Sequence, residues 1–534
     1  MTATIQTLLL LLAISVAVAI VAQRLKLAPS ILLVVAGIAL ALTPGIPRVD
    51  LAPEFVLLVI LPPLIYSAGV SMSWREFRFN LRPIALLAFG CVVFTTCAVA
   101  AAVHYLLGWQ WGVAFLLGAI VAPPDVVAPL AIARRLGMPR RILVVLEGEG
   151  LANDATALIL YRFAVAAVST GVFSFPQAAG TFALIVVGEL AWGIGVGWLA
   201  LRLRQWAHNP RVEITLSLMT PYLAYWVPEH YGGSGVLATV AAGLYVSWNG
   251  PLLISSATRL QGVFFWDLVI YLIESFVFLL TGLQARTLIE KAQAFSLRDV
   301  LIATAITTAI VIAARFVWMF PAVYLPRKLS ASLRERDPSP PWQWTFALAF
   351  TGVRGVVSLA AALAIPLTIA SGAPFPQRDL ILFITFGVII VTLVGQGLML
   401  PSVIRWLGLA DEGRAEQHRE REAELAARAE AISAARTHLE RLAVERNLGR
   451  AVIDFLNARH DHRMRLIPPD LNDGLAQMRL TNDLRLELIA AEREFLYQML
   501  RQGKITDESR RRMERELDLE EAAILSKREG ETPL

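Results

Sequence analysis

Three polar residues stand close together inside a long apolar stretch of the 534-residue chain. Residues 148–158 read GEGLANDATAL, which places Glu149, Asn153 and Asp154 between apolar runs on both sides. A carboxylate at the centre of a membrane helix costs roughly 2.5 to 3.5 kcal/mol, so acids at such positions usually face a cavity and serve an ion or proton path. The stretch therefore predicts an ion or proton site inside a membrane.

The spacing of these residues places them on one side of a predicted helix. Glu147, Gly150 and Asp154 lie at i, i+3 and i+7, and Glu149 and Asn153 lie at i and i+4 on the neighbouring stripe. Counted from the start of the apolar stretch, Asp154 would lie about 18 Å deep, near the middle of a core about 30 Å thick. A carboxylate there can be neutralised by a proton or by a monovalent cation, but not by both at once. We therefore expect Asp154 to exchange one proton for one cation, while Asn153 adds hydrogen bonds without a second titrating charge.

The composition is that of a membrane protein with a polar appendage. Hydrophobic residues make up 56% of the chain, charged residues 17%, and the mean hydropathy is +0.59, whereas soluble proteins are about 45–50% apolar and about 25% charged. From about Asp411 onward the chain is dense in Arg and Glu. We therefore predict a transmembrane domain over residues 1–407 and a cytosolic helical domain over 411–534. The net charge of +5 is modest and does not favour a nucleic-acid partner.

Apolar runs of the length that crosses a bilayer, about 20 residues, predict about thirteen transmembrane helices. Alternate connections between them are rich in Arg and Lys, with about 17 basic residues against about 5, and the basic side is the cytoplasmic one. We expect a multi-pass protein of the plasma membrane, in a bacterium the inner membrane, with the N-terminus outside and the tail in the cytoplasm. The predicted spans are residues 5–23, 28–44, 51–70, 83–107, 111–134, 142–168, 181–203, 213–228, 234–249, 262–284, 299–325, 343–367 and 379–404.

Two of these spans contain residues that interrupt a helix. A Pro-Pro pair directly precedes Asp125 in the fifth span, and glycines stand on either side of Arg354 in the twelfth. Proline removes a backbone donor and clashes with the preceding turn. If spans 1–6 and 8–13 are two repeats, both interruptions occupy the fifth place of their half, which is the inverted arrangement that places ion sites between broken helices. We predict an all-α polytopic fold of two inverted six-helix repeats with two unwound, crossing helices.

Other charged residues inside the spans need partners. A buried ion pair costs less than two isolated charges, so Arg315 in the eleventh span is expected to pair with Glu147 or Asp125. Glu274 in the tenth span either lines an access path or makes a local structural hydrogen bond. A purely structural role, without contact to the ion, is an open alternative for Arg315, Arg354 and Glu149.

Four stretches of the chain resemble the monovalent cation:proton antiporter-1 family, which includes bacterial NhaP-type sodium/proton antiporters. They read EGEGLANDATALILYRFAVAA, PPDVVA, LPPLIYSAG and TGVRGVVSLAAALAIP. The resemblance covers about residues 1–407 and implies electroneutral exchange of Na+, or of K+ or Li+, for H+ without a cofactor. It also implies a homodimer in which a core (about 83–168 and 299–404) moves past a dimerisation part (about 1–70 and 181–284).

The same resemblance implies roles for individual residues. Asp154 would carry the transported cation or the proton, with Asn153 as its companion. Asp125 would be the acid of the unwound helices, and Glu149 would form a core-stabilising ion pair with Arg354.

At three positions this chain has a different residue from the one that is frequent in the family or in some of its members. Pro124 stands where Thr is frequent, although the main-chain carbonyl that helps to hold the ion is retained. Gly150 replaces the Ser of the usual GES motif and offers no side-chain oxygen. Ser67 stands where some members have a Glu in the third span, on a possible access path. The selectivity among Na+, K+ and Li+ is therefore left open by the sequence.

The polar tail has the pattern of a helical unit. Leu425, Ile432 and Leu439 lie seven residues apart within 411–448, a spacing that suits either a short seam between protomers or a helix packed on its neighbours. Further helices are expected over Leu484 to Met499 and Glu508 to Ile524. The tail is predicted to regulate or to dimerise.

Two other functions are compatible with an intramembrane acid. A passive cation channel would keep a pH-independent flux after Asp154→Asn, and a transport-inactive sensor that signals through the tail would show no flux. An enzyme is not expected, because the sequence contains no metal-ligand spacing, no GxSxG and no paired intramembrane aspartates of a protease type.

Overall fold

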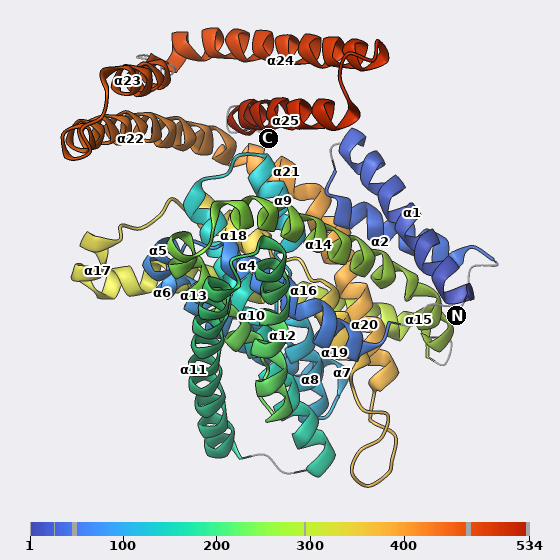
Figure 1. Ribbon diagram of the computed structural model, residues 1–534. Helices are drawn as coiled ribbons and strands as arrows, with labels where there is room; N and C mark the ends of the chain where they lie inside the picture. The colour runs from blue at the N-terminus through green and yellow to red at the C-terminus, as the bar shows by residue number, and fades with distance from the viewer. Residues whose placement is uncertain are drawn as a thin grey trace. The chain divides into compact units, whose positions relative to one another are not determined.

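The structure is a computed structural model that describes residues 2–25, 27–44, 51–171, 174–292, 295–465 and 471–529. Within these ranges every regular element is a helix, as the sequence predicts. The chain divides into two compact units, one formed by Met1–Arg134 and Arg140–Leu409 and the other by Arg135–Pro139 and Ala410–Leu534. Figure 1 shows the helices of both units.

Each predicted span falls on one helix or on consecutive helical segments of the first unit. Segments labelled η are π-helical turns. The bounds are α1 Thr2–Leu25, α2 Pro29–Leu42, α3 Pro53–Phe55, η1 Val56–Ile60, α4 Leu61–Ser71, α5 Trp74–Phe79, α6 Leu81–Ala85, η2 Leu86–Cys91, α7 Val92–Leu107, α8 Trp111–Val121, α9 Val127–Arg135, α10 Arg140–Thr170, α11 Phe175–Ala207, α12 Pro210–His230, α13 Val236–Leu253, α14 Ser256–Leu283, α15 Ala285–Ala292, α16 Leu297–Leu329, α17 Ala331–Arg336, α18 Trp342–Phe350, α19 Val356–Leu363, α20 Arg378–Ile390, η3 Val391–Gln396 and α21 Gly397–Trp406.

The length and hydropathy of these helices fit a multi-pass membrane protein. Eight helical runs among the described residues have at least 18 residues and are apolar enough to cross a membrane. Three shorter apolar helices, Leu9–Leu25, Pro29–Leu42 and Trp111–Val121, accompany them. The count of thirteen crossings and the inverted repeat stay predictions.

Both predicted helix interruptions are present. The first break separates α8 from α9 over residues 122–126, and the second separates α18 from α19 over residues 351–355. The breaks meet, because the Asp125 main-chain N–H donates to the Val353 carbonyl at 2.7 Å. A Cβ at Gly355 would lie 1.9 Å from the Asp125 carboxylate, so only glycine permits this approach. The sequence features that stop the two helices therefore also bring the breaks into contact.

The helix with the polar motif, α10, runs through the middle of this unit (Figure 1). It packs against α8 and α13 and against the segments α6 and η2. Its neighbour α8 packs on α7, which in turn packs on α16. Helix α10 is thus enclosed by other helices along the stretch that carries Glu149, Asn153 and Asp154.

The second unit contains the helices predicted for the tail. They are α22 Leu409–Glu445, α23 Arg450–Arg465, α24 Leu471–Arg501 and α25 Asp507–Glu529. Helices α24 and α25 run antiparallel around a small core of Ile489, Leu496, Leu517 and Ile524. Leu425, Ile432 and Leu439 are buried within the single chain. This burial favours packing of α22 on its own neighbours over a seam between protomers.

Candidate functional site

Asn153 is held by the first helix break and leaves one buried oxygen without a partner. Its Nδ2 donates to the Pro124 carbonyl at 2.6 Å. Because only the amide nitrogen can donate to a carbonyl, this bond fixes the orientation of the side chain. Asn153 Oδ1 then lies fully buried with no hydrogen-bond donor. A buried acceptor without a donor is costly, so this oxygen is suited to receive a cation or a water molecule.

Asp154 follows Asn153 on α10 and has no basic partner. Its side chain is partly exposed, and among the described residues its carboxylate forms neither a hydrogen bond nor an ion pair. The charged group that acts on it is another acid, Asp125. Two neighbouring carboxylates repel each other when both are ionised. A proton or a cation bound at Asp154 relieves that repulsion.

Asp125 is fixed in the first break by backbone hydrogen bonds. Its Oδ1 accepts from the Val127 N–H at 2.9 Å, at the start of α9, and its own N–H bonds across to the second break. A carboxylate at a helix N-terminus is favoured by the unpaired N–H groups there. The Asp125 carboxyl is therefore held in place within electrostatic range of Asp154.

Glu149 pairs with Arg315, and not with Arg354 as the family resemblance implied. The Arg315 guanidinium binds both carboxylate oxygens of Glu149, with the Nη2–Oε2 distance at 2.8 Å. Its Nε and Nη2 also donate to the Leu348 carbonyl at 3.2 and 2.9 Å. Both side chains are buried, 2% exposed for Arg315 and 0% for Glu149. This bidentate pair joins α10 to α16.

The prediction that Arg315 pairs with Glu147 or Asp125 is also wrong. Glu147 and Glu149 are two residues apart, so they point to different sides of α10. Glu149 faces α16, whereas Glu147 forms an ion pair with Arg134 of α9. Asp125 is engaged by the backbone of its own break.

Arg354 is held by main-chain carbonyls rather than by a carboxylate. Its Nε donates to the Val121 carbonyl at 2.9 Å, its Nη2 to the Ala122 carbonyl at 3.2 Å, and its Nη1 to the Gly352 carbonyl. Its own N–H donates to Thr392 Oγ1 at 3.0 Å. Carbonyls left unpaired at a helix C-terminus carry partial negative charge. Arg354 therefore satisfies the end of α8 and ties the two breaks together.

The two residues expected on an access path lie on helices α4 and α14. Glu274 of α14 is partly exposed and interacts electrostatically with Asp125 and Arg134. Ser67 of α4 is partly exposed as well. The structure thus places Glu274 within electrostatic range of the acids of the first break, and it gives Ser67 no specific contact with them.

Sequence reasoning missed an ion pair beyond Asp154 on α10. Arg162 lies two turns further along this helix and pairs with Glu229 near the end of α12. The side chains are 33% and 28% exposed. The pair joins α10 to a helix from the predicted dimerisation part.

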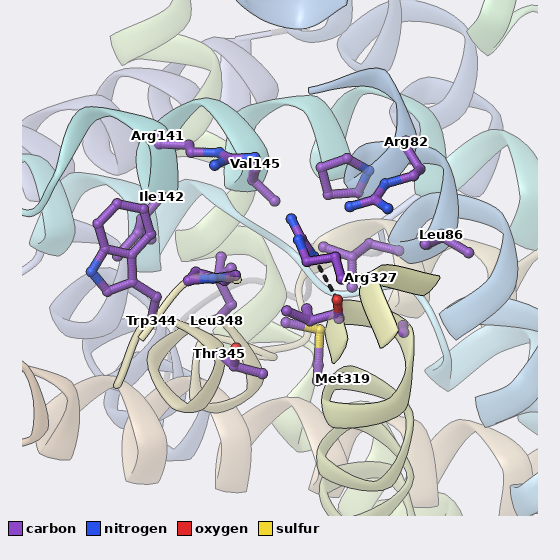
Figure 2. Close-up of a pocket in the computed structure, with 15 residues that line it drawn as sticks. Arg82, Leu86, Arg141, Ile142, Val145, Met319, Arg327, Trp344, Thr345 and Leu348 are labelled. Atoms are coloured by element: carbon purple, nitrogen blue, oxygen red, sulfur yellow. Dashed lines mark hydrogen bonds between the residues drawn. The ribbon is translucent and has the colours of Figure 1, made fainter. Parts of the chain in front are cut away.

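A second cluster that sequence reasoning missed surrounds Asp337. The Asp337 carboxylate accepts from Arg82 at 3.1 Å, from Arg141 at 2.7 Å and from Arg327 at 2.6 Å. The sequence indicates for these arginines only the cytoplasmic side of the membrane. Figure 2 shows them at a pocket that Met319, Trp344 and Leu348 line as well. The cluster joins the ends of α6, α10 and α16, so we assign it a role in holding these helices together.

Comparison with known proteins identifies the transmembrane part. A family model for the sodium/hydrogen exchanger transmembrane region matches residues 9–406. A protein of Mycobacterium tuberculosis named as an uncharacterized Na+/H+ exchanger is 33% identical over 521 residues, covering 96% of this chain and 94% of its own length. A sodium, potassium, lithium and rubidium/H+ antiporter of Bacillus pumilus is 34% identical over 377 residues, covering 68% of this chain and 56% of that protein.

Solved structures agree with this fold. The sodium proton antiporter MjNhaP1 of Methanocaldococcus jannaschii at pH 8 matches with a TM-score of 0.55 at 19% identity, covering 77% of this chain and 99% of that chain. A map of the same antiporter matches with a TM-score of 0.60, covering 75% and 97%. The arrangement of the helices is therefore shared with a known antiporter fold.

Proposed function

Because this chain belongs to the family of transmembrane sodium/hydrogen exchangers, we propose that it is a secondary antiporter that exchanges one monovalent cation for one H+ at Asp154. The observation that carries the assignment of the site is the orphaned, buried Oδ1 of Asn153, one residue before an intramembrane carboxylate that has no basic partner. These atoms are oxygen ligands, which alkali cations prefer. A proton neutralises Asp154 in place of the cation, so the two substrates compete.

The remaining acids and bases of the site keep fixed charges during this exchange. Glu149 is neutralised by Arg315, and the charge of Arg354 is solvated by the carbonyls of Val121, Ala122 and Gly352. Asp125 favours occupation of Asp154 by any cation, because it adds a negative charge nearby. The Pro124 carbonyl holds Asn153 in place and has a second lone pair for the ion. One exchangeable charge at one carboxylate makes the exchange electroneutral.

Access to the site alternates between the two sides of the membrane. We assign the moving core to residues 83–168 and 299–404, which contain both breaks, and the dimerisation part to residues 1–70 and 181–284 of a homodimer. Glu274 and Ser67, on helices of the dimerisation part, line a path by which the ion reaches the site. The excess of basic residues in alternate connections places the N-terminus outside and the tail, 411–534, in the cytoplasm.

Na+ is the cation proposed first, with K+ and Li+ as further substrates. The relative from Bacillus pumilus is named for four alkali cations. The matches to antiporters give no support to the channel or sensor alternatives.

The test is dissipation of a pH gradient in proteoliposomes by Na+, Li+ or K+, measured between about pH 6 and 9. Wild-type protein should dissipate the gradient, and Asp154→Asn should lose the activity while eluting as a folded protein in size-exclusion chromatography. Exchange that persists in Asp154→Asn contradicts a single carrier at Asp154. A flux that does not depend on pH in the same variant would favour a channel.

A further inference from the structure

The C-terminal end of α16 carries a groove on its surface, with a volume of about 640 Å³. Four apolar or aromatic side chains of α16 line one part of it: Phe320, Pro321, Tyr324 and Leu325. They form two neighbouring rows, each with a spacing of four residues, on one side of the helix. The rings of Phe320 and Tyr324 stack with 6.3 Å between their centroids, and Leu325 is 51% exposed. An exposed apolar face of this kind marks contact with a membrane or with another protein.

The other end of the groove is basic. Arg327, Lys328 and Arg334 line it, and none of the lining residues that the structure describes is an acid. Lys328 and Arg334 are exposed, and neither forms an ion pair within the described part of the chain. Two positive charges are therefore available to an anionic group at this end.

The groove is held in shape by hydrogen bonds between α16 and the connection that follows it. Arg327 Nε donates to the Asp337 carbonyl at 3.0 Å, and its Nη2 donates to the Asp337 carboxylate at 2.6 Å. The Tyr324 hydroxyl donates to the Pro340 carbonyl at 3.1 Å. The connection that carries Arg334 is thus fixed to α16 at two points, so the basic end and the apolar part keep their relative positions.

The cluster around Asp337 adds positive charge next to the groove. Its carboxylate accepts from Arg82, Arg141 and Arg327, so three positive charges share one negative charge. Arg327 lines both the groove and the pocket of Figure 2. The other acid of the connection, Glu335, is not among the residues that line the groove. The complement of this positive surface is an anionic ligand.

The position of the groove in the membrane favours a lipid over a free anion. The connection after α16 is one of those predicted to lie in the cytoplasm, and basic pockets on that side of a membrane bind the head groups of anionic lipids. Lys328 and Phe320 are eight residues apart, about 12 Å along the helix, so the apolar part extends into the hydrocarbon half-layer, which is about 15 Å thick. A free phosphate would contact the basic end alone, whereas a phospholipid would contact both parts.

We propose that this groove binds one anionic phospholipid, with its phosphate at Lys328 and Arg334 and an acyl chain against Phe320 and Leu325. The groove lies on α16, within the proposed moving core. The lipid is therefore bound by the core itself and not by a contact between protomers. This ligand is additional to the cation and the proton, and its binding does not depend on the assignment of Asp154.

The experiment measures lipid binding to the full-length, detergent-purified protein. Dioleoyl phosphatidylglycerol, dioleoyl phosphatidylcholine and glycerol 3-phosphate are titrated separately, and apparent Kd values are taken from the shift in thermal unfolding. Lys328→Gln combined with Arg334→Gln removes both available charges. The matched control is Arg75→Gln combined with Arg78→Gln, which removes two exposed bases on the same predicted side of the membrane that do not line the groove.

Wild-type protein should bind phosphatidylglycerol at least about fivefold more tightly than phosphatidylcholine, which has the same chains and no net charge. The Lys328/Arg334 double variant should weaken phosphatidylglycerol binding by about five- to twentyfold, because one base near an anionic lipid is worth about fivefold. The Arg75/Arg78 control should change it by less than about twofold, because distant exposed charges are screened by salt.

Three results would overturn the proposal. Equal affinity for the two phospholipids shows that charge does not select the ligand, and equal weakening in both double variants shows that binding is not at the groove. Glycerol 3-phosphate that binds as tightly as phosphatidylglycerol shows a site for a free phosphate. None of these results bears on exchange at Asp154, because transport is not measured.

A substitution in the apolar part keeps the proposal testable if the Lys328/Arg334 variant does not fold. Leu325→Ser shortens an exposed side chain without a change in charge. It should weaken phosphatidylglycerol binding by about three- to tenfold, through lost contact with an acyl chain, and leave binding of glycerol 3-phosphate unchanged. Undiminished phosphatidylglycerol binding in folded Leu325→Ser would contradict a lipid in this groove.

Discussion

Two acids of helix α10, five residues apart, lie in opposite surroundings. Glu149 is fully buried and locked by the bidentate guanidinium of Arg315, whereas Asp154 is partly exposed and has a like charge, Asp125, as its electrostatic neighbour. A carboxylate that is permanently neutralised cannot take up and release a cation. We therefore propose that the absence of a basic partner, rather than depth in the membrane, distinguishes the carrier Asp154 from Glu149.

The two helix breaks differ in the same way. The first break contains an acid, Asp125. The second contains a base, Arg354, whose guanidinium donates hydrogen bonds to carbonyl groups at both breaks. Arg354 therefore holds the two breaks together without forming an ion pair with Asp125. Substitutions in these interactions should affect stability, most where a buried charge loses its counter-charge and least where the pair reaches solvent.

The largest loss of stability is expected from Glu149→Gln. It leaves Arg315 buried without a counter-charge, and removal of one partner of a buried pair costs about 3–5 kcal/mol. Thermal unfolding of the detergent-purified protein measures the loss. The control is Glu149→Leu combined with Arg315→Met, which removes both charges and should recover much of it. A Glu149→Gln protein as stable as wild type would refute the structural role of the pair.

A smaller loss is expected from Arg354→Lys. The ammonium group keeps the charge but cannot reproduce the planar fork that reaches three carbonyls. Unpaired buried acceptors cost about 1–3 kcal/mol, so the melting temperature should fall less than in Glu149→Gln. The same protein should bind cation more weakly, because the break that holds Asp125 is loosened. A drop in stability larger than that of Glu149→Gln would invert the proposed ranking.

The smallest loss of stability is expected from Glu229→Gln. The Arg162–Glu229 pair is about one-third exposed, and pairs that reach solvent contribute about 0–1 kcal/mol. Thermal unfolding should be nearly unchanged. The pair joins α10 of the proposed core to α12 of the proposed dimerisation part. The apparent KM for the cation should therefore shift instead, because the pair restrains movement between these two parts. A large fall in melting temperature would contradict the expectation that this exposed pair contributes less to stability than the buried Glu149–Arg315 pair.

Hydropathy and breaker residues were sufficient to predict the all-helical membrane fold and the two helix interruptions. Each predicted span falls on helical segments, and the Pro-Pro pair before Asp125 and the glycines around Arg354 interrupt their helices as predicted. These features are local, because a proline or an apolar run acts on its own segment of chain. The polar motif on α10 is equally local.

The pairing of charges could not be read from the sequence, because it depends on contacts between distant segments. Glu149 and Arg315 are 166 residues apart, and several combinations of the buried acids and bases balance the charge equally well. The main-chain partners of Arg354 carry no sequence signal at all. The packing of Val126 on Gly150 likewise depends on how the first break crosses α10, which spacing along one helix does not reveal.

Cation-evoked proton release from the purified protein is the most direct test of competition at Asp154. The protein is placed in weak buffer with a pH dye, between about pH 6 and 9, and Na+ is added without any membrane gradient. Wild-type protein should release up to one H+ per protomer with saturation at high Na+, and Asp154→Asn should release none. Sodium binding to the wild type without proton release, or equal release from Asp154→Asn, would contradict the account.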